Sequence, residues 1–313
     1  MKDVSPTSPE ERARVEARGG LVRHLDRIGP GSRVYEVSKR AIVGVYADGF
    51  IHAGNLAYLA LLTLFPFFII LSAVAQLFGH GPETMVAVQS FLRTLPPTVA
   101  GLLAQPIADV LAARTGMLLW FGALVGLWSV VSFIETIRDI LRRAYGTLYA
   151  RSFWAYRLSS IAIVIGATVL ALVAFSAQIF LTAIEQFIIR LIPFADDVAA
   201  WVGLSRLLPL AALSGALYVL FYSLTPSKYR YMACPKWPGA LFTAFWWMAV
   251  TVALPPALGL LGGYDLTYGS LAGVIIALIF FWFVGLGLVF GAHLNAALAE
   301  PPMETVKEPG STG

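Results

Sequence analysis

The segment "NLAYLALLTLFPFFII", Asn55 to Ile70, is almost entirely apolar and lies within a longer apolar run over about 54 to 78. A helix needs about 20 mainly apolar residues to cross the hydrocarbon core of a bilayer. Five further runs of suitable length follow, over about 116 to 134, 158 to 182, 204 to 224, 239 to 261 and 270 to 297. They are continuous, whereas the strands of a membrane barrel alternate between apolar and polar residues. The sequence therefore predicts an all-α polytopic membrane protein with six transmembrane helices.

The overall composition agrees with this class. Hydrophobic residues make up 58% of the 313 residues and charged residues 13%, and the mean hydropathy is +0.76. Soluble domains are roughly 45 to 50% apolar and about 25% charged. Residues 1–30 and 300–313 are polar and are predicted to be disordered cytoplasmic tails that flank a transmembrane domain over 31–299.

The basic residues predict the orientation. All but four of the 22 lysines and arginines fall on segments that six spans place on one side; the exceptions are Arg93, Arg114, Arg190 and Arg206. The positive-inside rule then puts both termini in the cytoplasm and the segment His80 to Thr115 outside. Anionic headgroups account for the net charge of +4, so no nucleic-acid partner is expected. The single cysteine, Cys234, excludes a disulfide framework within the chain.

Two segments outside the spans have amphipathic character. Ser32 to Phe50 shows an apolar face typical of an interfacial helix lying on the inner leaflet. The segment from His80 to Thr115 favours two amphipathic helices separated at Pro96-Pro97. These helices would lie on the outer surface or cap a cavity, and a plain connector is the alternative.

Polar and helix-breaking residues share one face of the first span. At 100° per residue this face and its flanks hold Asp48, His52, Asn55, Tyr58, Thr63 and Pro66. Because polar groups are costly in hydrocarbon, this stripe is expected to face the bundle interior or a watered cavity. Pro66 frees a carbonyl near Leu62 and can kink the helix, and Thr63 can satisfy backbone there. Hydrogen bonding that merely holds helices together is the alternative.

The second and last spans carry further polar residues near the same predicted depth. These are Glu135, Arg138 and Asp139 on the second span and His293 and Asn295 on the last. The predicted topology brings them to the cytoplasmic side together with the start of the first span, so a shared polar cavity is expected. In the alternative interpretation each residue is structural, with Asp139 neutralising Arg142 or Arg143.

Several motifs, in order, resemble those of one family. They are "NLAYLALLTLFPFF" (55–68), "LWSVVSFIETIRD" (127–139), "LYVLFYSLTPSKYRYMACPKWPGAL" (217–241), "YDLTYGSLAGVIIALIFFW" (264–282) and "GAHLNAALA" (291–299). Together they resemble the YihY/BrkB family of bacterial inner-membrane proteins, whose older label is ribonuclease BN. The resemblance implies six transmembrane helices, a location in the cytoplasmic membrane and transport of a lipid or envelope precursor. His293 departs from it, because the family commonly has an acidic residue there.

Enzymatic functions find little support in the sequence. The four histidines, His24, His52, His80 and His293, match none of the H-x-H-x-D-H or H-E-x-x-H patterns of metal hydrolases. No Walker loop, nucleophile elbow or dinucleotide fingerprint is present either. We therefore expect no enzymatic activity and no cofactor.

The expected function is transport or flipping of an amphiphile with an anionic headgroup. Arg138 would hold a phosphate, Asn55 and Thr63 would offer neutral hydrogen bonds, and the surroundings of Tyr58 and Trp246 would receive an acyl chain. A scaffold protein for envelope assembly is the alternative, followed by a membrane-bound hydrolase or ribonuclease. The expected partners are membrane lipids, and the sequence leaves open whether the chain forms a homo-oligomer.

Overall fold

The structure, a computed structural model, describes residues 33–77, 88–89, 91–93, 95–113, 116–147, 154–169, 208–231, 234–260 and 271–299. Its labelled elements are α2 (Arg33–Gly44), η1 (Val45–Gly49), α3 (Phe50–Leu77), α5 (Pro97–Ala113), α6 (Gly116–Ala144), α9 (Leu208–Leu224), α10 (Ser227–Arg230), α11 (Trp237–Leu260) and α13 (Ala272–Leu298). A further helix covers Trp154–Val169. These ranges contain no strand, and the predicted all-α class is confirmed. The two predicted tails lie outside the described residues.

Four described helices are long and apolar enough to cross a membrane. They cover Phe50–Ala73, Trp120–Ala144, Trp237–Leu260 and Ala272–Leu298. The shorter apolar helix Trp154–Val169 overlaps the predicted third span and begins before it, and Leu210–Leu224 falls within the predicted fourth span. The remainder of the third predicted span lies outside the described residues.

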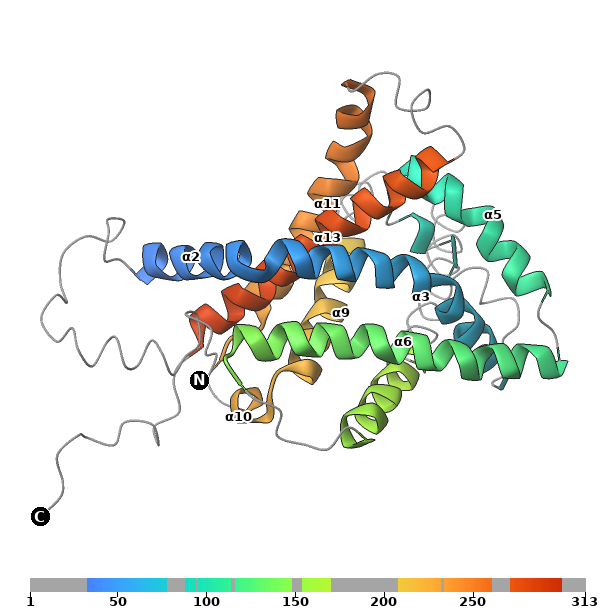
Figure 1. Cartoon of the computed structure of the whole chain (residues 1–313), viewed down its shortest axis with the longest axis horizontal. Helices are drawn as coiled ribbons and strands as arrows, with labels where there is room; N and C mark the ends of the chain where they lie inside the picture. Colours follow the sequence, from blue (N-terminus) through green and yellow to red (C-terminus); the bar gives the residue numbers. More distant parts are fainter. Residues whose placement is uncertain are drawn as a thin grey trace, which may run out of the picture.

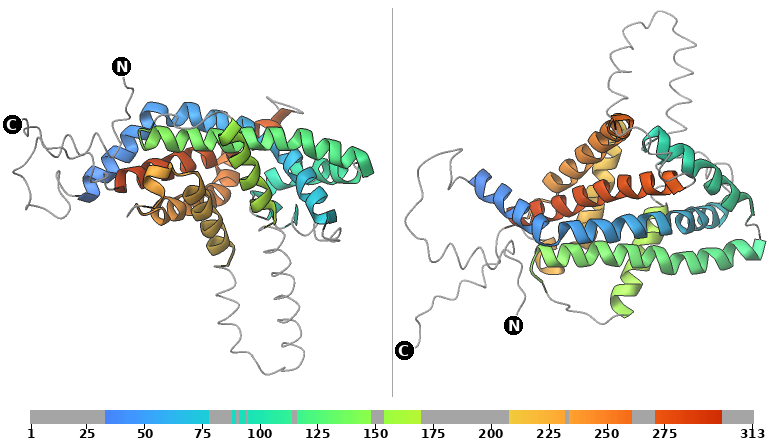
Figure 2. Two further views of the ribbon diagram at one scale, coloured as in Figure 1. Left: turned by 90° about the horizontal axis from the view of Figure 1, so that it is seen from below. Right: turned by 45° about the horizontal axis from the view of Figure 1, so that its top comes forward.

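Helices α13, α3 and α6 lie side by side and form the body of the molecule, with α3 in the middle (Figures 1 and 2). Helix α11 packs on α13, and α9 packs on α11. Large apolar side chains fill the interfaces, including Phe68 and Leu71 of α3 with Phe280 of α13 and Val250 of α11. This bundle fixes the position of α6, whose far end carries the charged residues described below.

Helices α2, η1 and α3 follow one another without a break, and the second half of α3 bends away from the line of α2 (Figure 1). At 1.5 Å per residue their helical path is about 67 Å long, more than twice the roughly 30 Å of a hydrocarbon core. Val37 and Ala41 of α2 are buried, and α2 packs on α13, whereas Ile42 and Tyr46 are exposed. The predicted helix over Ser32 to Phe50 is thus present, and it continues directly into the first span.

The segment before α6 contributes to the core. Val88, Leu95, Val99, Leu103 and Ile107 are buried in the cluster formed by α3, α11 and α13. Helix α5 begins at Pro97, so the predicted separation at Pro96-Pro97 matches the start of a described helix. The segment therefore packs against one end of the bundle, which argues against a plain connector.

Pro66 lies inside α3 and faces α6 at Gly126. A Cβ atom added at Gly126 would lie 2.9 Å from the Pro66 Cβ atom. The absence of a side chain at Gly126 thus permits the close approach of the two helices. The sequence suggested that Thr63 satisfies a backbone carbonyl near Leu62. In the structure its hydroxyl donates to the Leu59 carbonyl at 2.6 Å.

Candidate functional site

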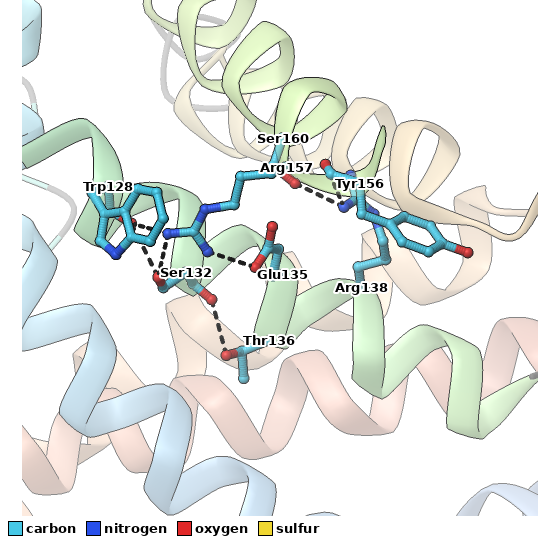
Figure 3. Close-up of polar contacts among 8 residues, drawn as sticks. All are labelled: Trp128, Ser132, Glu135, Thr136, Arg138, Tyr156, Arg157 and Ser160. Carbon is cyan, nitrogen blue, oxygen red and sulfur yellow. Dashed lines mark hydrogen bonds and ion pairs between the residues drawn. The ribbon is translucent and has the colours of Figure 1, made fainter. Parts of the chain in front are cut away.

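The most highly charged buried contact in the described residues joins α6 to the helix Trp154–Val169 (Figure 3). The apolar run predicted a helix ending near residue 134, but α6 continues to Ala144. Its last turns carry Glu135, Arg138 and Asp139, and the facing helix supplies partners for Glu135 and Arg138. Because these partners satisfy the polar groups, the helix can extend beyond its apolar part.

Arg157 projects from the helix Trp154–Val169 onto α6. Its Nη1 pairs with the Glu135 Oε2 atom at 2.8 Å, and its Nη2 donates to the Trp128 carbonyl at 3.1 Å and to the Ser132 hydroxyl at 3.3 Å. The guanidinium carbon lies 3.7 Å from the centroid of the Trp128 ring, which is a close cation–π contact. Arg157 is therefore fixed by hydrogen bonds, charge and stacking at once.

Arg138 projects in the opposite direction, from α6 onto the helix Trp154–Val169. Its Nη1 donates to the Ser160 hydroxyl at 2.7 Å and to the Tyr156 carbonyl at 3.2 Å. Its guanidinium also lies 5.3 Å from the Tyr156 ring centroid. The residue is 7% exposed, and among the described residues it makes no ion pair. Arg138 thus keeps a buried positive charge whose hydrogen-bond partners, the Ser160 hydroxyl and the Tyr156 carbonyl, are uncharged.

Asp139 serves its own helix. Its carboxylate pairs with Arg143 Nε at 2.9 Å and with Arg142 Nη2 at 3.5 Å. Arg142 also lies over the Tyr156 ring, at 5.5 Å from the centroid. The geometry favours the structural alternative for Asp139, which neutralises two following arginines.

The contact contains two buried guanidiniums and one carboxylate. The guanidiniums of Arg157 and Arg138 both lie at the interface between α6 and the helix Trp154–Val169, and the carboxylate of Glu135 lies between them in Figure 3. Guanidinium groups bind carboxylates and phosphates through parallel hydrogen bonds. Charged groups within a membrane-spanning helix are costly and are most often functional. We call Glu135, Arg138 and Arg157, with their partners Trp128, Ser132, Tyr156 and Ser160, the arginine site.

Asn295 occupies a structural position in α13. It is fully buried; its amide oxygen accepts from Gly239 N–H at 2.8 Å, and its amide nitrogen donates to the Lys236 carbonyl at 3.1 Å. The first bond satisfies the Gly239 N–H, one of the groups that a helix N-terminus leaves unpaired, and the second adds to the bond that the Lys236 carbonyl accepts from the Ala240 N–H at 3.3 Å. Asn295 therefore ties α13 to α11.

The loop before α11 is held by a buried lysine. Lys236 Nζ donates to the carbonyls of Tyr229 and Arg230 at 3.1 and 2.9 Å. Burial away from water lowers the pKa of the Lys236 ammonium from its ordinary value. Together with Asn295 this lysine fixes the connection between α9 and α11.

His293 and Trp246 also pack within the bundle. His293 is buried, and its ring occupies the space that a side chain at Gly44 of α2 would need. The indole N–H of Trp246 donates to the Phe283 carbonyl at 2.7 Å, which joins α11 to α13. Neither contact lies at the arginine site.

The polar stripe of the first span does not share one environment. Asn55 and Tyr58 are exposed, His52 is half-buried, and Thr63 is buried and bonded to its own helix. Asp48 lies in η1, and its side chain lies outside the described residues. The expected uniform orientation of this stripe toward the bundle interior is therefore not observed for Asn55 and Tyr58. The reason lies within α3 itself: at 100° per residue Tyr58 and Thr63 point about 140° apart, so one can be exposed while the other is buried.

The structure thus brings together Glu135 and Arg138 but not the whole predicted set. The hydrogen bonds of Arg138 go to the helix Trp154–Val169 and not to the first span. Asn295 bonds to α11. Sequence reasoning missed Arg157, Tyr156 and Ser160. The segment "YRLSS" (156–160) at the start of an apolar run could have indicated them, because it offers an arginine to pair with Glu135 and a serine to bind Arg138. Among the described residues no group of three His, Cys, Asp or Glu side chains is placed to hold a metal ion.

Comparison with known proteins finds similarity along most of the chain. The family described as virulence factor BrkB matches residues 46–311. A ribonuclease-like protein of Bacillus subtilis (strain 168), YfkH, is 30% identical over 257 residues, which cover 80% of this chain and 90% of the relative. The UPF0761 membrane protein PSHAa0171 of Pseudoalteromonas translucida (strain TAC 125) is 25% identical over 264 residues, covering 82% and 84% of the two chains. No solved structure matches the chain.

Proposed function

Because the chain belongs to the BrkB family of membrane proteins, we propose that it is a transporter or flippase-like protein for a lipid or amphiphilic envelope precursor with an anionic headgroup. We propose that it acts in the bacterial cytoplasmic membrane, with both termini in the cytoplasm. The proposal includes no enzymatic reaction and no cofactor.

The buried charge of Arg138 is the observation that carries this proposal. An arginine in a membrane helix costs about 2.5 to 3.5 kcal/mol on insertion scales, and a structural arginine normally recovers this by pairing with a carboxylate. Arg138 instead contacts the Ser160 hydroxyl and the Tyr156 carbonyl, both uncharged. Glu135 pairs directly with Arg157 and acts on Arg138 only at a distance, so an anionic headgroup would be the direct ion-pair partner of Arg138.

The distribution of basic residues supports entry of the headgroup from the cytoplasmic side of the membrane. In the proposed orientation, the end of α6 that carries Arg138, Arg142 and Arg143 lies at the cytoplasmic surface. Phosphate groups of the inner leaflet occupy this depth, and basic side chains attract them. A headgroup would therefore reach the arginine site directly from the inner leaflet.

The remaining steps use the exposed face of the first span. Asn55 and Tyr58 are exposed on α3, where an amide and a phenol offer neutral hydrogen bonds to a headgroup that leaves the arginine site. Apolar surface beside them accommodates acyl chains. Thr63, Trp246 and Asn295 have partners within the bundle, so we assign them to the framework that holds these helices.

The alternative is a non-catalytic scaffold for envelope assembly. A scaffold needs the bundle and an interaction surface, but it does not need a buried arginine that makes no ion pair within the described part of the chain. The two functions therefore differ in their dependence on Arg138.

Transbilayer movement of labelled lipids tests the proposal. The full chain is reconstituted in liposomes, and movement of an anionic and a zwitterionic labelled lipid is compared for wild type, Arg138→Ala and Arg93→Ala. Arg93 is an exposed arginine outside the site and serves as the matched control. We expect wild type and Arg93→Ala to move the anionic lipid, and Arg138→Ala to move it at least about tenfold more slowly, since one strong charged contact is lost. If correctly inserted wild type moved neither lipid above empty liposomes, with and without a proton gradient, the scaffold function would replace this proposal.

A further inference from the structure

Glu135 is the only side chain of the arginine site that carries a negative charge. Its Oε2 atom pairs with Arg157, and its charge also acts on Arg138, with which it shares the same side of α6 (Figure 3). Glu135 therefore occupies the position between two guanidiniums that an external anion would take.

The two partners of the Glu135–Arg157 pair differ in how firmly they are held. The Arg157 side chain is 6% exposed and contacts Glu135, Ser132 and both the carbonyl and the ring of Trp128 on α6. The Glu135 side chain is 25% exposed, and its buried Oε1 atom has no hydrogen-bond partner among the described residues. A buried carboxylate oxygen without a partner is unfavourable. Glu135 is thus the partner that can move aside at the lower cost.

The charges of the site then distinguish between phosphate headgroups. Within the arginine site, Arg138 and Arg157 together carry two positive charges, and Glu135 supplies one negative charge. The neighbouring Arg142, whose charge also acts on Arg138, pairs with Asp139. A phosphodiester carries a single negative charge, so exchanging it for Glu135 leaves the charge of the site unchanged. A phosphomonoester carries about −1.5 to −2 at neutral pH and would serve both guanidiniums.

We propose that Glu135 is an internal anion that a headgroup must replace, and that it makes the site selective for phosphomonoester or diphosphate headgroups over phosphodiester ones. This inference rests on the proposed function, because it assigns the headgroup class to the same site. The exchange breaks one ion pair and forms others, with no covalent step. Repulsion by Glu135 disfavours any ligand whose charge is too small to displace it.

Headgroup binding to the purified full chain tests the inference. Dihexanoyl phosphatidic acid and dihexanoyl phosphatidylglycerol have equal acyl chains and differ in the headgroup, and glycerol 3-phosphate is the free phosphomonoester. Each is titrated into wild type, Glu135→Gln and Glu135→Asp, with isothermal calorimetry as the readout. Circular dichroism and gel filtration verify that each variant is folded, and Glu135→Asp keeps the charge as the matched control.

We expect wild type and Glu135→Asp to prefer phosphatidic acid by about tenfold, since a single charge contact changes affinity by roughly this factor. Glu135→Gln should bind phosphatidylglycerol about tenfold more tightly than wild type, so that the preference disappears. If glycerol 3-phosphate binds as tightly as phosphatidic acid, the phosphate alone is recognised. If it binds more weakly, the acyl chains contribute to recognition. Either outcome supports the role of Glu135 when Glu135→Gln has lost the preference for phosphatidic acid.

An equal preference in wild type and Glu135→Gln would overturn the inference, as would loss of both lipids in folded Glu135→Gln. These outcomes are separable from failure of the proposed function. Transport of anionic lipid by wild type with no change of preference in Glu135→Gln refutes only the role of Glu135, whereas absence of transport refutes the function itself.

Discussion

Two asparagines, Asn55 and Asn295, have opposite environments although the sequence assigned both to one cavity. Asn295 is fully buried and bonds to Lys236 and Gly239, whereas Asn55 is exposed on α3. Helical periodicity gives the angle of a residue on its own helix, but it does not identify the neighbouring helix. The residues that a polar side chain contacts therefore indicate whether its role is structural or functional.

Replacing Asn295 by Ala should destabilise the protein. The change leaves the buried Gly239 N–H without its partner, whereas the Lys236 carbonyl keeps its bond from the Ala240 N–H, and an unsatisfied buried group costs about 1 to 3 kcal/mol. Thermal unfolding in detergent measures the effect, with Asn55→Ala as the control that should leave the midpoint nearly unchanged. Equal midpoints for Asn295→Ala and wild type would contradict the assigned role of Asn295.

The helices themselves were predicted better than their ends. The apolar runs located α3, α6, α11 and α13, but the second run ended about ten residues before α6 does. Hydropathy stops at Glu135 and Arg138 because they are polar, whereas the helix continues because the helix Trp154–Val169 satisfies them. The arginine site was therefore predictable only on one side, from α6. Its other side depends on which helix packs there, and a single sequence does not state this.

The contact of α3 with α6 at Pro66 leads to a prediction for Gly126. Gly126→Ala should lower stability, because its Cβ atom would come within 2.9 Å of Pro66 and overpacking costs about 1 to 3 kcal/mol. Gly215→Ala in α9 is the matched control, since nothing lies within 4 Å of its added Cβ atom. There the change should be neutral or stabilise by up to about 1 kcal/mol. Thermal unfolding of both variants compares them, and a shift in the same direction would argue against the close contact.

For the whole molecule, membrane insertion leads to a testable orientation. With the native Cys234 replaced by Ser, a cysteine at exposed Gln89 should react with an impermeant reagent from outside the cell. A cysteine at exposed Ser227 should react only after the cytoplasmic side is made accessible. The expected result follows from the positive-inside rule. The reverse labelling pattern would refute the proposed orientation and with it the entry of the headgroup from the inner leaflet.

A second whole-molecule prediction concerns ribonuclease activity, which the name of one relative suggests for that relative. The purified chain should not hydrolyse RNA with added magnesium, manganese or zinc, because no three His, Cys, Asp or Glu side chains in the described part of the chain are placed to hold a metal ion and the sequence lacks hydrolase ligand patterns. Release of acid-soluble nucleotides from labelled RNA measures this. Turnover that disappears in His52→Ala and returns with zinc would reverse the prediction.

Photo-crosslinking tests most directly whether an anionic headgroup binds at the arginine site. A phosphatidic acid analogue with a photoreactive group beside the headgroup is incorporated into membranes that contain wild type or Arg138→Ala. Crosslinked peptides are then identified by mass spectrometry. We expect crosslinks concentrated on residues 128–142 and 154–160, and a decrease of about tenfold or more in Arg138→Ala. Crosslinks spread over the exposed apolar surfaces of α3, α6 and α11, with the same yield in both proteins, would contradict it.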